Sequence, residues 1–80
     1  MIHRSVKVFT IPSCRWCSKL IEFLESNKIE FHEYNIAEDM NARREMLKII
    51  NQIAVPTTVI SGEYITGYNE QALKSKLGLN

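Results

Sequence analysis

Residues 5–17 read SVKVFTIPSCRWC, and the change of pattern inside this segment sets the architecture of the chain. Residues 5–10 alternate between two faces and are rich in β-branched side chains, which is typical of a strand. Pro12 and Ser13 interrupt that pattern. From Cys14 onward apolar residues recur every three or four positions, so a helix is expected directly after the break. The apolar stripe of this helix comprises Cys17, Leu20, Ile21 and Leu24.

The rest of the chain predicts three more strands and two more helices. Alternating, aromatic and branched residues indicate the strands, and apolar residues at helical spacing indicate the helices. A Ser61-Gly62 pair predicts a tight hairpin between the last two strands. Strands are expected over residues 29–36, 57–61 and 63–66, and helices over 41–51 and 70–77.

Capping residues support these helix ends. Asn27 and Gly78 suit the position just past a helix, where a left-handed backbone is common. Asp39 or Asn41 is expected to cap the second helix, and Asn69 the third, because their side chains accept bonds from free first-turn amides.

The element order is therefore β-α-β-α-β-β-α. The first βαβ unit should be parallel and right-handed, since such crossovers almost always are. With the first strand central, we expect a four-stranded mixed sheet of order 2-1-3-4. Helices one and three would cover one face and helix two the other, which makes residues 1–80 a single α/β domain.

Composition excludes several classes of protein. The chain has 80 residues, 45% of them hydrophobic, and a net charge of +1, which is ordinary for a globular domain. No basic patch indicates nucleic acid, and no apolar run is long enough to span a membrane. The first residues lack the apolar stretch of a secretory signal. We therefore expect a cytoplasmic protein that acts as a monomer.

Two cysteines, Cys14 and Cys17, carry the functional signal. A disulfide between residues three apart closes almost no loop, so it stabilises little and indicates redox or metal chemistry instead. Cys14 falls at a helix start, where free amides stabilise a thiolate and pKa values of roughly 3.5–7.5 are typical. Arg15 adds a positive charge beside it. Cys14 is thus the expected nucleophile, and Cys17, on the apolar stripe, the buried resolving thiol.

With these motifs in place, the chain resembles the glutaredoxins of the thioredoxin superfamily. The similarity rests on the segment 9–17, on Val55-Pro56 and on the segment Ile65-Thr66-Gly67-Tyr68-Asn69, and it extends from the first strand to the last helix. The resemblance implies a thioredoxin-like fold and a thiol-disulfide oxidoreductase that reduces protein disulfides or glutathione mixed disulfides.

The resemblance also implies roles for residues outside the cysteine pair. Val55-Pro56 would be a cis bond facing Cys14, and the Val55 backbone would pair with a bound thiol peptide. Gly67, Tyr68 and Asn69 would hold the γ-glutamyl carboxylate of glutathione, the expected co-substrate. Trp16, placed at the helix start, is expected to be exposed and to contact substrate.

Departures from the family pattern favour an alternative electron donor. Many glutaredoxins carry a lysine where this chain has Ile11, and the usual Thr-Val-Pro is Ala54-Val55-Pro56. Arg15 could replace part of the lost charge. The pattern also resembles small redoxins that thioredoxin reductase recharges and that serve ribonucleotide reductase. A third possibility is a non-enzymatic carrier of an iron–sulfur cluster or another metal, although no bound metal or cofactor is expected.

The histidines, two methionines and a run of charged residues are expected to have structural rather than catalytic roles. His3 and His32 are expected to be exposed rather than catalytic. Met40 and Met46 are expected to fill the core or to lie next to it. Arg43-Arg44-Glu45 would form the solvated face of the second helix.

Overall fold

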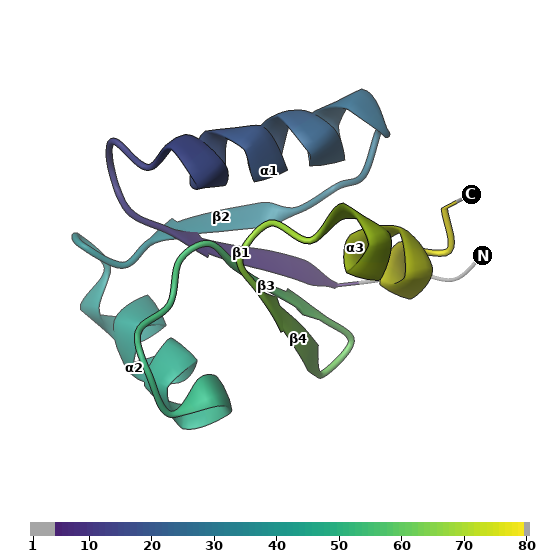
Figure 1. Cartoon of the computed structure of the whole chain (residues 1–80). Coiled ribbons are helices and arrows are strands. Elements are labelled where there is room, and N and C mark those ends of the chain that lie inside the picture. The colour runs from purple at the N-terminus through teal and green to yellow at the C-terminus, as the bar shows by residue number, and fades with distance from the viewer. Residues whose placement is uncertain (1–4, 80) are drawn as a thin grey trace.

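The computed structural model describes residues 5–79. Figure 1 shows the sheet running through the middle of the molecule, with α1 above it and α2 below. In the described part of the chain, no helix has the length and apolar character needed to cross a membrane. The elements are β1 Val6–Thr10, α1 Arg15–Ser26, β2 His32–Asn35, α2 Met40–Ile50, β3 Thr57–Ile60, β4 Glu63–Thr66 and α3 Glu70–Leu77.

The strand order is β2-β1-β3-β4, as the sequence predicts. β1 and β2 are parallel, because α1 carries the chain back across the sheet between them. β1–β3 and β3–β4 are antiparallel. Ser61 and Gly62 form the two-residue turn between β3 and β4, both with positive φ, at 49° and 87°. Such a turn matches the twist of the two strands it joins.

Alternation along β1 divides the hydrophobic core into two layers. Val6 and Val8 belong to the cluster that α1 and α3 cover, with Leu20, Leu24 and Leu73 among its members. Phe9 points to the opposite cluster, which α2 completes. The expected assignment of helices to faces is therefore confirmed.

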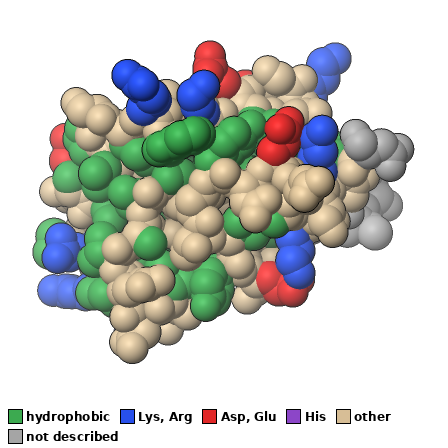
Figure 2. Space-filling model, in the orientation of Figure 1, with side chains coloured by type: hydrophobic (Ala, Val, Ile, Leu, Met, Phe, Trp, Pro, Cys, Tyr) green, Lys and Arg blue, Asp and Glu red, His purple; other side chains and the backbone are tan. Residues whose placement is uncertain are grey.

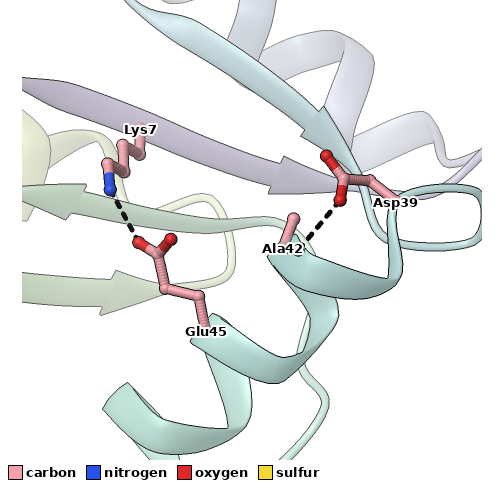
Figure 3. Close-up of polar contacts among 4 residues, drawn as sticks. All are labelled: Lys7, Asp39, Ala42 and Glu45. Atoms are coloured by element: carbon pink, nitrogen blue, oxygen red, sulfur yellow. Dashed lines mark hydrogen bonds and ion pairs between the residues drawn. The ribbon is translucent and has the colours of Figure 1, made fainter.

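Each helix begins at a side-chain cap. The Cys14 sulfur caps α1, Asp39 Oδ1 accepts from the Ala42 amide at 3.0 Å, and Asn69 Oδ1 accepts from the Ala72 amide at 3.1 Å. Figure 3 shows the Asp39 cap beside an ion pair that joins β1 to α2. In that pair Lys7 Nζ lies 2.7 Å from Glu45 Oε2, and this hydrogen bond raises the pKa of Lys7.

The connection between α1 and β2 differs from the expectation. Asn27 is the C-cap itself, with φ −96°, and the left-handed residue is Lys28, with φ 57°. The Ile29 amide then bonds to the Leu24 carbonyl at 2.9 Å, so it belongs to the helix end rather than to a strand. The strand prediction for residues 29–31 was therefore wrong.

Smaller corrections concern α2 and the histidines. The helix occupies Met40–Ile50 rather than 41–51, because the left-handed Asn51 ends it. Met46 is fully buried, but Met40 is 53% exposed at the first position of the helix, so the expectation that it lies in or next to the core was wrong. His32 is exposed, as expected, whereas His3 lies outside the described residues.

Candidate functional site

The cysteine pair lies where the chain leaves β1 and begins α1. Ser13 takes a left-handed backbone, with φ 59°, and turns the chain into the helix. The Cys14 sulfur accepts a hydrogen bond from the Cys17 amide at 3.2 Å. The two cysteines form a disulfide with their Cα atoms 5.2 Å apart. The sulfur of Cys14 therefore occupies the place of an N-cap side chain, where free amides favour negative charge.

The two sulfur-bearing residues differ in exposure. Cys17 is 4% exposed and is part of the buried face of α1. Cys14 is half-buried and Arg15, the first residue of α1, is exposed. Arg15 makes no ion pair with any residue between 5 and 79. Its charge is therefore not neutralised by an ion pair within the described residues, one position after Cys14.

An aromatic contact joins the start of α1 to the loop before α3. The ring of Trp16 stacks on Tyr68 with centroids 6.2 Å apart, and Tyr68 meets Phe23 edge-on at 6.0 Å. Trp16 remains 56% exposed, as its position predicted. The pKa of Tyr68 is raised, chiefly by burial and further by the negative charges of Glu70 and Glu22.

The Val55-Pro56 bond is cis, as the family resemblance implied. Pro56 is buried, and its carbonyl accepts from the Gly67 amide at 2.7 Å. Gly67 has φ 73° with open space around its Cα, so backbone conformation rather than crowding favours glycine here. This bond ties the segment before β3 to the loop that carries Tyr68.

Strand register brings these segments to one end of the sheet. Phe9 is the partner of Thr57, so the chain leaving β1 toward Cys14 and the chain entering β3 from Pro56 share that end. Figure 1 shows the same convergence near the labels of β1 and β3. Asn69 lies in the adjoining loop, but its side chain is used to cap α3.

Sequence reasoning missed two carboxylates beside the disulfide. Cys14 and Cys17 line a cavity of about 390 Å³ together with Glu22 of α1 and Glu33 of β2. The Thr10 hydroxyl donates to Glu33 Oε2 at 2.9 Å. The parallel register pairs Glu33 with Val8, two residues before Thr10, so only the register could have revealed this contact.

The described part of the chain contains no candidate metal site. Within residues 5–79 no three His, Cys, Asp or Glu side chains are grouped so that they could hold a metal ion.

Comparison with known proteins identifies the family. The glutaredoxin family model matches residues 6–65. The chain belongs to the glutaredoxin family, and its strand order and helices form the thioredoxin-like fold.

Individual relatives agree with this assignment. An uncharacterized glutaredoxin-like 8.6 kDa protein in a rubredoxin operon of Clostridium pasteurianum is 40% identical over 65 residues, covering 81% of this chain and 87% of the relative. Glutaredoxin 3 of Escherichia coli strain K12 is 29% identical over 77 residues, covering 95% and 93%. The crystal structure of the thioredoxin-like protein BC3987 superposes with a TM-score of 0.84 at 31% identity, covering 89% and 97%.

Proposed function

We propose that the chain is a dithiol thiol–disulfide oxidoreductase that reduces protein disulfides or glutathione mixed disulfides. The observation that carries this proposal is the Cys14 sulfur at the start of α1, bonded to the Cys17 amide while Cys17 itself is buried. A thiolate at that position is stabilised by the helix and remains accessible to a substrate.

The reaction follows from this asymmetry in two exchange steps. The Cys14 thiolate attacks one sulfur of the substrate disulfide, a Cys14–substrate bond forms, and the other substrate sulfur leaves as a thiolate that takes up a proton. Cys17, after losing its proton, attacks the Cys14 sulfur and releases the second substrate thiol. The Cys14–Cys17 disulfide then holds the two oxidising equivalents, and its 5.2 Å Cα separation suits this bond.

Substrate binding is assigned to the segments that converge on the disulfide. The Val55 backbone would pair with an extended thiol peptide beside Cys14. The loop at Gly67 and Tyr68 would receive the carboxylate of glutathione next to the N-terminus of α3, a position that favours anions. Trp16 would cover the bound peptide, since it stacks on Tyr68 and remains exposed.

Glutathione is the first proposed electron donor, and thioredoxin reductase is the second. The second candidate is favoured by Ile11, which is 39% exposed and lines the cavity at the disulfide, so this wall offers an apolar contact and no cation. One relative is named for its place in a rubredoxin operon, and its name states no electron donor.

A pair of coupled assays tests the function and the donor. Reduction of a protein disulfide is followed with NADPH and either glutathione plus glutathione reductase or thioredoxin reductase. We expect turnover with at least one donor and complete loss in Cys14→Ser. Cys17→Ser should lose reduction of protein disulfides but keep removal of glutathione from a mixed disulfide.

Glu30→Gln, an exposed change away from the cysteines, serves as the control and should keep the wild-type rate. Undiminished turnover in Cys14→Ser would contradict the proposal. Visible absorption after anaerobic purification, together with no turnover from either donor, would replace it with a cluster carrier.

A further inference from the structure

The cavity beside the disulfide is bounded by α1 and β2. We name it the dithiol groove, defined by Ile11, Cys14, Cys17, Ile21, Glu22 and Glu33. Tyr68 and Pro56 do not line it, so the groove is separate from the loop before α3 and from the cis-proline segment, and Ile11 is where it borders the expected glutathione site. Because Cys14 itself lines this groove, the groove is within reach of the residues next to a substrate cysteine that is bonded to the Cys14 sulfur.

The charged side chains that line the dithiol groove are all negative. Glu22 and Glu33 line it, and none of its lining residues in the described chain is Lys, Arg or His. Arg15 lies next to Cys14 in sequence but does not line the groove. A cation placed in the groove would therefore meet two carboxylates, whereas an anion would be repelled by both.

Glu33 is held in place before any ligand arrives. Thr10 is 2% exposed, and its hydroxyl donates to Glu33 Oε2 at 2.9 Å across the β1–β2 pair. A carboxylate fixed in this way loses less conformational freedom when it binds a partner. Its second oxygen remains available to accept a hydrogen bond, because a carboxylate has capacity for several.

Glu22 lies between the dithiol groove and the aromatic contact of Trp16 with Tyr68. It lines the dithiol groove and also the groove around Tyr68, and its charge contributes to the raised pKa of Tyr68. In the Tyr68 groove Lys19 and Lys74 offset the acidic side chains, whereas the dithiol groove contains no such cation among its lining residues.

We propose that the dithiol groove receives a Lys or Arg side chain of the substrate polypeptide, so that the protein prefers disulfides whose cysteine has a basic neighbour. This inference rests on the proposed oxidoreductase function and adds a substrate class to it. The aliphatic stem of the basic residue would pack on Ile11 and Ile21 while its charged end reaches Glu22 and Glu33. Glutathione is a net anion whose ammonium group belongs to its γ-glutamyl end, so it would gain less from this groove than a basic polypeptide.

The test uses three peptides that differ only in the residue next to a single cysteine, which is Lys, Gln or Glu. Each cysteine carries thionitrobenzoate as a mixed disulfide. When the reduced Cys14 thiolate attacks the peptide sulfur, the bond to thionitrobenzoate breaks and the coloured thiolate leaves. This single turnover requires no electron donor and reports the first exchange step alone.

For the wild-type protein we expect the Lys peptide to react about three- to tenfold faster than the Glu peptide at low salt, which is the range of two partly exposed charge pairs. Salt should reduce this ratio. Glu33→Gln and Glu22→Gln should each move the ratio toward one. The matched controls Glu30→Gln and Glu25→Gln remove the same charge from exposed positions outside the groove and should keep the ratio.

Equal rates for all three peptides in the wild-type protein would overturn this inference and leave the proposed function intact. An equal fall of the ratio in the control variants would also overturn it, because net charge rather than the groove would then be responsible. No release from any peptide would overturn the proposed function, and this inference with it.

Discussion

The cap of α3 allows stability and function to be separated by a matched pair of substitutions. Asn69 Oδ1 accepts from the Ala72 amide at 3.1 Å, and the backbone of Asn69 has the extended conformation of an N-cap. The helix has only 8 residues, and the loop with Gly67 and Tyr68 runs directly into this cap. Asn69→Ala removes the bond and leaves the first turn of α3 with one more free amide.

The expected cost follows from the number of bonds lost. One N-cap side chain contributes about 1 kcal/mol, with a range of about 0.5–2 kcal/mol. For a domain of this size each 1 kcal/mol lowers Tm by about 4–8 °C. Asp39→Ala removes an equivalent bond of 3.0 Å at the start of α2, on the opposite face of the sheet (Figure 3). The two variants should therefore lose similar stability.

Their effects on activity should differ. A loss of about 1 kcal/mol corresponds to a factor of about five in the equilibrium between the ordered and the frayed turn. Asn69 lies in the loop to which glutathione binding is assigned, so we expect up to a fivefold loss of kcat/KM with a glutathione mixed disulfide. Asp39 lies in the connection between β2 and α2, and its variant should keep the wild-type value.

Thermal unfolding by circular dichroism and steady-state kinetics measure both quantities for both variants. An unchanged Tm in Asn69→Ala would show that the cap contributes nothing. A loss of kcat/KM in Asp39→Ala equal to that in Asn69→Ala would refute the local role of the α3 loop, because general destabilisation would then explain both.

Three further outcomes are expected. Iodoacetamide should alkylate Cys14 of the reduced protein well before Cys17, as peptide mapping by mass spectrometry would reveal; faster labelling of Cys17 would reverse their roles. Burial raises the pKa of Tyr68 in the folded protein above its ordinary value, because it disfavours the phenolate. The contribution of Tyr68 to the free energy of unfolding is therefore fully present below the ordinary tyrosine pKa and is lost as pH rises through the raised pKa of the folded state. Denaturant unfolding at increasing pH should show a smaller decline of this free energy in Tyr68→Phe than in the wild-type protein. Met46→Ala should cost about 2–5 kcal/mol in chemical denaturation, whereas Met40→Ala should cost almost nothing because its side chain is exposed.

Local sequence determined most of the backbone. The bounds of α3, its Asn69 cap and the Ser61-Gly62 turn agree with the structure because each depends on residues within a few positions of one another. The placement of Cys14 at a helix start follows in the same way from the change of periodicity after Pro12. The cis Val55-Pro56 bond was predicted only from the family resemblance, and the structure confirms it. Hydrophobic periodicity carries no information about the isomer of a proline bond.

Contacts between distant residues required the tertiary structure. Residues 29–31 have a strand-like pattern, yet the Ile29 amide bonds to the Leu24 carbonyl at the end of α1 and so is not available to pair with a strand. Met40 lies on an apolar pattern but projects at the helix start, where nothing covers more than half of it. The strand order and the face of the sheet that each helix covers could be predicted from the sequence. Which apolar side chains remain exposed at the helix ends, as Met40 does, could not.

The site divides in the same way. The sequence by itself located the cysteine pair, because Cys14 caps a helix that the same segment forms and Cys17 lies on the buried face of that helix. Only the fold decided what surrounds them. Trp16 meets Tyr68, and Glu33 receives the Thr10 hydroxyl beside the disulfide, because the parallel pairing of β1 with β2 and the packing of α1 against the loop before α3 set those distances. A shift of register by one residue would turn Glu33 to the other face of the sheet.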